Sequence, residues 1–154
     1  MTNLPAPLLA LSVQEPWSTA ILDFGKDVEN REWHRSPGLL AQARRLVGRR
    51  LMLHAGKTFD DSGVPVVRAL TGQRLLKADC TLGAVLGVIT IQAVMVDGEP
   101  TSGWAARGAV HLHVAHPVRL TDPIPCRGAL GFFCPDDTVQ ERVRRQLTAQ
   151  GVTL

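Results

Sequence analysis

The stretch GAVLGVITIQAVMV, from Gly83 to Val96, constrains the fold of this chain more than any other. It is rich in β-branched residues, which pack well on the pleated surface of a sheet. We therefore expect a long central strand there, with the other elements arranged around it. No apolar run in the sequence approaches the roughly 18 residues needed to span a bilayer, so we expect no membrane partner.

Hydrophobic periodicity and turn residues predict the other elements. Pro16 suits the first turn of a helix, where a missing N–H costs nothing, and Asp136 is typical of a helix N-cap. Pro117 is expected to break a strand. The predicted strands are 8–13, 27–33, 49–56, 109–120 and 128–133; the predicted helices are 16–25, 60–77 and 135–150, with a turn at 123–125 and a loop over 34–48 that has room for a short helix.

These elements predict one domain over residues 1–154, a length that allows a single sizeable core. Five or six strands with about three helices predict the α+β class, most simply a mixed β-barrel with helices on its outside. Hydrophobic residues make up 45% of the chain and charged residues 20%, which are values of globular proteins and exclude a disordered chain.

Cysteine usage and the N-terminal sequence predict a cytoplasmic protein. Cys80, Cys126 and Cys134 are odd in number and lack CxxC spacing, so we expect reduced thiols and neither a disulfide framework nor a zinc site. The segment MTNLPAPLLALSVQEPW lacks the basic start of a signal peptide.

Positive charge is concentrated in two segments, AQARRLVGRRL and QERVRRQL, while the whole chain carries a net charge of +3. Basic clusters favour an anionic partner and raise the rate of encounter with nucleic acid. Clusters this short are equally typical of solvated faces, so both interpretations stay open.

The segment QEPWSTAILDFGKDVENREWH, from Gln14 to His34, holds two of the three tryptophans and a dense group of mixed charges. In a strand over 27–33, Glu29 and Arg31 would share one face, and Lys26 would join them from the preceding turn. Such a trio is either a surface ion network of little energetic weight or part of a site.

Several segments, in their order along the chain, resemble the ASCH domain, a branch of the PUA-like superfamily. They are SVQEPWSTAILDFGKDVENREW, LMLHAGK, GAVLGVITI, SGWAARGAVHLHVAHPVRL and PIPCRGALGFF, of which GKDVENR and CRGALGFF are the most specific. The resemblance covers nearly the whole chain and implies a PUA-like β-barrel with flanking helices and a cleft beside the Gly25–Lys26 turn. ASCH relatives are implicated in RNA binding, and wider PUA-like relatives bind single-stranded or modified bases.

On this basis we expect a site for single-stranded RNA, another single-stranded nucleic acid or a nucleotide, without a cofactor. An unstacked base needs an aromatic surface, worth about 1–3 kcal/mol per base, and polar groups for its edge, while lysine and arginine hold phosphates. Trp17 and Trp33 would serve equally as core residues. The candidate binding residues are Gln14, Trp17, Lys26, Glu29, Asn30, Arg31, Trp33, His54, Lys57 and Trp104.

The same segment is also compatible with an enzyme. Some ASCH proteins hydrolyse acylated cytidine with what resembles a Lys–Thr–Glu arrangement, and Lys26 matches that lysine. Glu29 stands where the threonine is expected, and Thr19 and Thr58 have no motif support, so a threonine nucleophile is missing from its place. Lys26 and Glu29 remain the catalytic candidates, for general acid–base chemistry.

The histidines suggest a different enzyme class, and the cleft itself suggests a protein-docking role. His111 and His113 are spaced to lie on one face of a strand, with His116 nearby and His54 at the end of another strand. Paired histidines suit a ribonuclease or a metal site, although HLHVAH has no carboxylate partner and we expect no metal. A protein-docking module would use the same cleft as a groove for a protein partner.

Overall fold

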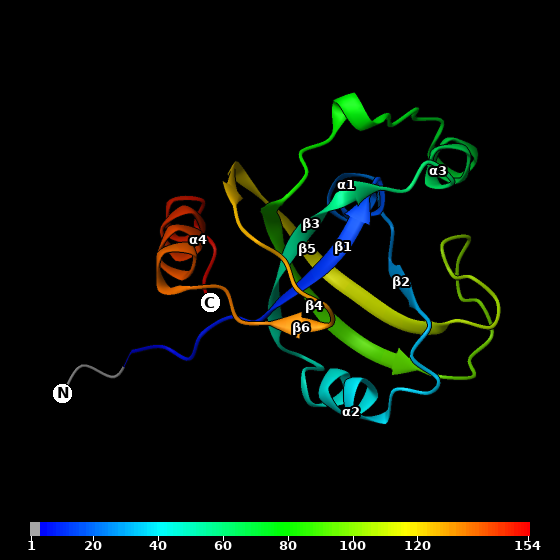
Figure 1. Ribbon diagram of the computed structural model, residues 1–154, viewed down its shortest axis with the longest axis horizontal. Coiled ribbons are helices and arrows are strands. Elements are labelled where there is room, and N and C mark those ends of the chain that lie inside the picture. The colour runs from blue at the N-terminus through cyan, green and yellow to red at the C-terminus, as the bar shows by residue number, and fades with distance from the viewer. Residues whose placement is uncertain (1–3) are drawn as a thin grey trace.

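The computed structural model describes residues 4–154. Within this range the protein is α+β, with six strands in one mixed sheet of order β2-β5-β4-β3-β1-β6. The sheet curls into a half-barrel with helices around it, and β2 and β6 form its two edges (Figure 1). The elements are β1 (Ala10–Glu15), α1 (Trp17–Asp23), β2 (Val28–Arg31), α2 (Pro37–Arg45), β3 (Arg50–Phe59), α3 (Gly63–Thr71), a 3₁₀ turn (Lys77–Asp79), β4 (Ala84–Met95), β5 (Val110–Pro125), β6 (Phe132–Phe133) and α4 (Asp137–Ala149).

Strand β1 is buried on both faces at its start, where Ala10 and Leu11 lie, and on one face toward its end, where Gln14 is exposed. It pairs in parallel with β3 and antiparallel with β6. Leu11 and Val13 face one core cluster with Ile89 of β4, while Ala10 faces a second cluster with Val143 and other residues of α4. Because side chains alternate along a strand, the same strand helps to build both cores.

The α1–β2 connection places Lys26. Gly25 has a φ of +75°, in the left-handed region that glycine adopts without steric cost. The N–H groups of Phe24 and Lys26 both donate to the carbonyl oxygen of Ala20, at 3.0 and 3.1 Å. The helix therefore ends in a tight turn, and the side chain of Lys26 is directed into the protein.

The predicted break at Pro117 and the predicted turn at 123–125 are wrong, because β5 runs without interruption through both. Thr90 of β4 pairs with Ala115 and Val88 pairs with Val118, so the two intervening residues of β5 bulge out of the ladder. His116 there has a φ of +52°. A bulge accommodates a proline that cannot donate to the ladder.

Helix boundaries also differ from the prediction. The helix expected over 60–77 is shorter, since α3 covers Gly63–Thr71 and is followed by Gly72, whose φ of +76° is typical of a helix C-terminus. The short helix that the 34–48 segment had room for is the nine-residue α2. Helix α4 is confirmed, with the carboxylate of Asp136 accepting a hydrogen bond from Val139 N–H at 3.0 Å. None of the helices in residues 4–154 is long and apolar enough to cross a membrane.

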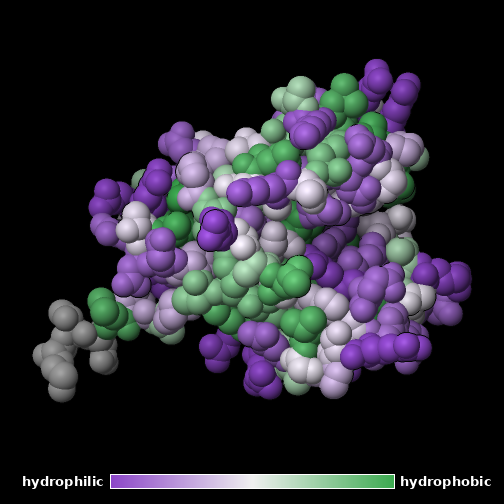
Figure 2. All heavy atoms as spheres, in the orientation of Figure 1, coloured by the Kyte–Doolittle hydropathy of each residue, from purple (hydrophilic) through white to green (hydrophobic). Residues whose placement is uncertain are grey.

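The surface in the same orientation shows two features side by side. A hydrophobic patch lies over β6 and the loop before it, where Leu130 is 99% exposed (Figure 2). A recess with hydrophilic walls adjoins this patch on the side of β2 (Figure 2).

Candidate functional site

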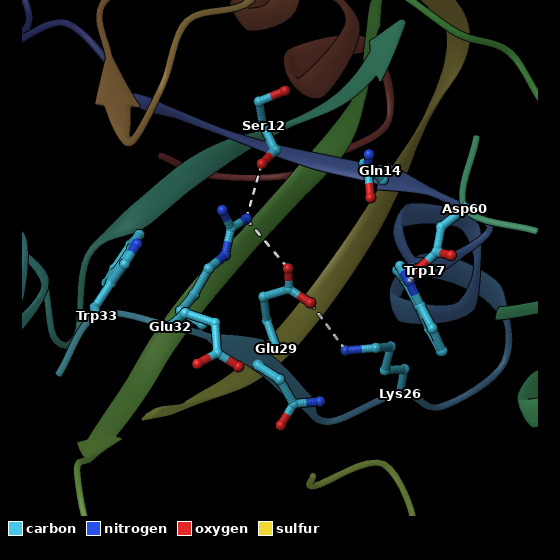
Figure 3. A pocket seen from close by; sticks show the side chains of 10 residues that line it. Ser12, Gln14, Trp17, Lys26, Glu29, Glu32, Trp33 and Asp60 are labelled. Carbon is cyan, nitrogen blue, oxygen red and sulfur yellow. Dashed lines mark hydrogen bonds and ion pairs between the residues drawn. The ribbon is translucent and has the colours of Figure 1, made fainter. Parts of the chain in front are cut away.

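A cleft of about 460 Å³ opens beside the Gly25–Lys26 turn, where the family resemblance implies it. Its walls come from β1, the start of α1, the α1–β2 connection, β2 with the two residues that follow it, and the residue after β3 (Figure 3). The lining residues are Ser12, Gln14, Trp17, Lys26, Glu29, Asn30, Arg31, Glu32, Trp33 and Asp60.

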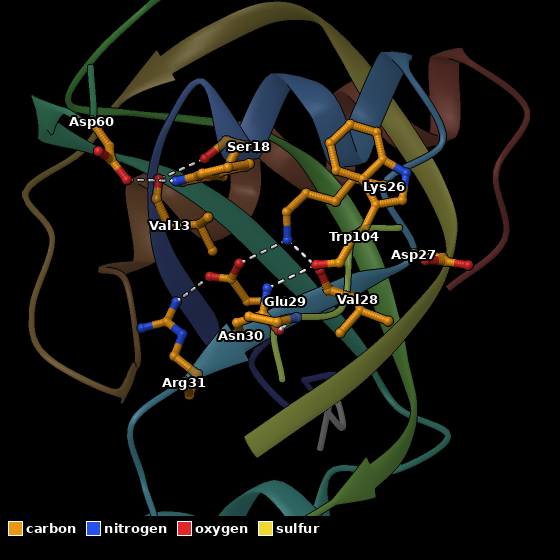
Figure 4. Close-up of polar contacts among 12 residues, drawn as sticks. Val13, Ser18, Lys26, Asp27, Val28, Glu29, Asn30, Arg31, Asp60 and Trp104 are labelled. Atoms are coloured by element: carbon orange, nitrogen blue, oxygen red, sulfur yellow. Dashed lines mark hydrogen bonds and ion pairs between the residues drawn. The ribbon is translucent and has the colours of Figure 1, made fainter. Parts of the chain in front are cut away.

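A continuous ion network crosses this cleft. Lys26 Nζ lies 3.1 Å from Glu29 Oε1, and Arg31 Nη2 lies 3.1 Å from Glu29 Oε2 (Figure 4). Lys26 is 3% exposed and Glu29 is 7% exposed, so this is a largely desolvated network. The expected convergence of the three charges in one concavity, and the pairing of Glu29 with its basic neighbours, are both confirmed.

The two cations of the network have further partners inside the protein. Lys26 Nζ also donates to the carbonyl oxygen of Val28, and Arg31 Nη2 donates to that of Ser12 at 2.8 Å. Both cations are therefore committed to the protein, unlike the phosphate-holding role expected from the sequence. With Glu32 and Asp60 counted, two cations and three carboxylates line the cleft, which gives it a formal charge of −1.

Trp17 and Trp33 lie on opposite sides of the network (Figure 3). Trp17 is partly exposed, its indole N–H donates to Asp60 Oδ2 at 2.9 Å, and Lys26 Nζ lies 5.5 Å from its ring centroid. Trp33 is 8% exposed, belongs to the larger core cluster and packs edge-on against Phe132. Trp17 is therefore the better candidate for stacking, and Trp33 serves mainly the core.

Asp60 orients Trp17 and was not identified from the sequence. Hydrogen bonds from the hydroxyl of Ser62 and the indole of Trp17 lower the pKa of Asp60. The carboxylate therefore stays charged at neutral pH. Ser12 and Glu32 were missed as well; Glu32 stands inside the ENREW segment, whereas nothing local to Ser12 and Asp60 marks them.

Asn30 anchors a loop. Its side-chain amide donates to Trp104 O at 2.9 Å, and its carbonyl oxygen accepts from Ala106 N–H at 2.9 Å (Figure 4). Trp104 does not line the cleft, and it packs against the small core cluster of Ala20 and Val67. Asn30 thus lines the cleft, but its side chain forms its hydrogen bonds with the 101–109 loop.

Gln14 is the most exposed of the predicted amides in the cleft. Its Nε2 donates to Thr58 Oγ1 at 2.7 Å. Its side-chain oxygen has no partner among residues 4–154 and is available to a ligand.

His54 and Lys57 lie outside the cleft. Both line a neighbouring groove with the loop over 127–130, and Ser12 is common to the two sites. His54 is 1% exposed, with Nε2 at 2.7 Å from Cys126 O and Nδ1 at 3.0 Å from Ser12 Oγ. Burial lowers the pKa of His54, so its ring is neutral at pH 7.

The hydroxyl groups that an amidohydrolase would need are not gathered at the cleft. Thr19 Oγ1 donates to the fully buried carboxylate of Glu15 at 2.6 Å, and Thr58 accepts from Gln14. Neither threonine lines the cleft. Of the described residues that do, Ser12 alone carries a hydroxyl, and that group points away from Glu29 (Figure 3).

The paired histidines also lie elsewhere. The ring centroids of His111 and His113 are 6.4 Å apart, and His111 Nε2 is 2.7 Å from Ala106 O. Both residues belong to β5 and lie outside the cleft. Residues 4–154 contain no group of three or more His, Cys, Asp or Glu side chains placed to hold a metal ion.

Comparison with known proteins adds no family assignment. The chain matches no protein-family model and no curated protein.

Proposed function

We propose that this protein is an ASCH-type nucleic-acid-binding domain whose cleft takes one unstacked base of single-stranded RNA or of a nucleotide. The observation that carries the proposal is the partly exposed ring of Trp17 beside the desolvated Lys26–Glu29–Arg31 network. The cleft volume of about 460 Å³ falls within the roughly 300–1,000 Å³ that is usual for small-molecule sites.

Stacking and edge recognition are both supported by these side chains. Trp17 supplies a π-face, which accepts any base. Its orientation is fixed by the 2.9 Å hydrogen bond to Asp60, so little freedom is lost when a base stacks on it. Unstacked bases are recognised by hydrogen bonds to their edges, and the carboxylates of Glu29, Glu32 and Asp60 are acceptors for such bonds.

The charge of the cleft favours one kind of edge. A carboxylate accepts hydrogen bonds from the exocyclic amino group and ring N–H of a base, and it repels a phosphate. We therefore expect bases with an amino group to bind better than uracil, and we expect the phosphate of the ligand to lie outside this cleft.

Binding is better supported than hydrolysis. Lys26 Nζ is engaged by the carboxylate of Glu29 and by the carbonyl oxygen of Val28, which hinders its use as a general base. The cleft also lacks a hydroxyl directed toward Lys26 among the described residues. A threonine-type amidohydrolase would need both a lysine that can act as a base and a hydroxyl group directed toward it.

The test is a calorimetric titration of the protein with single-stranded oligonucleotides and with free nucleosides at low salt. Wild-type protein should bind cytidine more tightly than uridine. Trp17→Leu should weaken binding of every base by roughly 5-fold or more, the loss of about 1 kcal/mol of stacking. Trp104→Phe, at an aromatic residue outside the cleft, is the matched control and should bind like wild type. Absence of binding to any base by the wild-type protein would instead favour a protein-docking role.

A further inference from the structure

A second groove, of about 390 Å³, adjoins the cleft across β1 and is built from two of the segments that the cleft does not use. The LHAGK segment of β3 contributes one wall, and the CRGALG loop before β6 contributes the other. The lining residues are Ser12, His54, Gly56, Lys57, Arg127, Gly128, Ala129 and Leu130.

The charge of this groove is opposite to that of the cleft. Lys57 and Arg127 are both exposed, and no carboxylate lines the groove within residues 4–154. Neither cation takes part in an ion pair in the described part of the chain. The groove therefore presents two uncompensated positive charges, whereas the cations of the cleft are bound to Glu29.

The floor of the groove is polar and uncharged. The Cys126 carbonyl can only accept, so His54 Nε2 donates to it and Nδ1 accepts the hydroxyl proton of Ser12. In this arrangement neither residue places a negative charge near Lys57 or Arg127.

Glycine at position 128 allows the loop to lie directly on this floor. A Cβ atom there would meet His54 Cε1 at 2.6 Å and Ser12 Oγ at 3.3 Å, so a larger residue would force the loop away. None of the described residues accepts a hydrogen bond from the backbone N–H of Gly128 or Ala129. Backbone N–H groups next to two cations are a common arrangement for phosphate oxygens.

Ser12 joins the two sites. Its carbonyl oxygen accepts from Arg31 on the cleft side, and its hydroxyl points away from Arg31, toward His54 (Figure 3). We propose that the groove holds a phosphate of the nucleotide whose base occupies the cleft. This inference rests on the proposed function, since it divides one ligand between a site of charge −1 and a site of charge +2. The phosphate belongs either to a free nucleotide or to the backbone of a strand.

The experiment compares four probes at constant salt: cytidine, cytidine 5′-monophosphate, a short oligocytidylate and inorganic phosphate. The test variant is Lys57→Gln/Arg127→Gln, which removes both groove cations. The control is Arg44→Gln/Arg45→Gln, which removes two exposed cations from α2, away from the groove.

In the test variant, cytidine should bind as in wild type, while a phosphate-bearing probe should lose roughly 10-fold in affinity. The salt slope of oligocytidylate binding should fall by about 0.7, because the groove holds one phosphate and each phosphate neutralised on a single strand contributes about 0.7. Loss confined to oligocytidylate identifies a backbone phosphate as the ligand, and loss for the monophosphate as well identifies a terminal phosphate. The control should lose less than twofold.

Equal losses in the two double variants would overturn the inference, because any pair of surface cations would then account for the effect. Failure of the proposed function alone would give a different pattern, in which no base binds to the wild-type protein. Inorganic phosphate would nevertheless shift the backbone NMR signals of Gly128 and Ala129 in wild type and not in the test variant. That outcome would retain the groove as a phosphate site without the base.

Discussion

Replacing Glu29 by Gln should be among the most destabilising single changes at the cleft. The substitution keeps the size of the side chain but leaves Lys26 and Arg31 without their shared counter-charge. Removing one partner of a buried pair typically costs about 3–5 kcal/mol. This cost applies to Lys26, which is 3% exposed, whereas the Arg31 side chain is 20% exposed and its charge is partly screened by solvent. We therefore expect the lower end, about 3 kcal/mol.

Urea denaturation measures this free energy directly. A matched control is Glu141→Gln, which breaks the pair with Arg145, where both side chains are more than two-thirds exposed. An exposed i,i+4 pair of this kind contributes about 0.3–0.5 kcal/mol. Combining Glu29→Gln with Lys26→Met should recover part of the loss, because the more deeply buried of the two uncompensated charges is then removed as well. A loss for Glu29→Gln no larger than that for Glu141→Gln would show that the network is solvated and that the cleft floor is not a desolvated site.

Three further predictions concern a histidine, a cysteine and the absence of hydrolysis. Burial lowers the pKa of His54 from 6.5, so the stability that its neutral ring contributes is fully present above about pH 6.5 and is lost as the pH falls toward the folded-state pKa. His54→Gln should therefore flatten the dependence of the unfolding free energy on pH in this range. An unchanged slope would contradict this account of His54. Partial burial, followed by the influence of Glu15, raises the pKa of Cys80 to about 12. Iodoacetamide at neutral pH should therefore label the exposed Cys134 in the native protein and Cys80 only after unfolding, as mass spectrometry would show. Early labelling of the half-buried Cys80 would contradict its raised pKa. Wild-type protein should not hydrolyse acetylated cytidine in a chromatographic product assay, and turnover that Lys26→Ala abolishes would mean that Glu29 replaces the missing hydroxyl.

Local sequence patterns predicted the elements with strong periodicity or clear caps. The β-branched run over 83–96 is β4, and Asp136 caps α4 as its position indicated. Pro117 misled the prediction because the ability of β5 to bulge depends on its pairing with β4, which no local pattern encodes. For the same reason the sequence could not fix how far the sheet closes, since this depends on whether β2 and β6 meet.

The sequence predicted which residues meet at the candidate site better than it predicted what their side chains do there. Alternation along β2 correctly placed Glu29 and Arg31 on one face, and Lys26 joined them from the turn. The sequence did not show that these charges are paired with one another and desolvated, because burial arises from packing between distant segments. It also grouped His54 and Lys57 with the cleft, whereas β1 separates them from it.

The central claim, that a base stacks on Trp17, is tested most directly by the indole N–H signals in NMR spectra. The chain has three tryptophans, so Trp17, Trp33 and Trp104 give three signals that single substitutions assign. On titration with a short single-stranded RNA, the Trp17 signal should shift most and saturate with the binding curve, while the signal of Trp104 should stay in place. Shifts confined to the arginine clusters of α2 and α4, with the Trp17 signal unmoved, would contradict the claim.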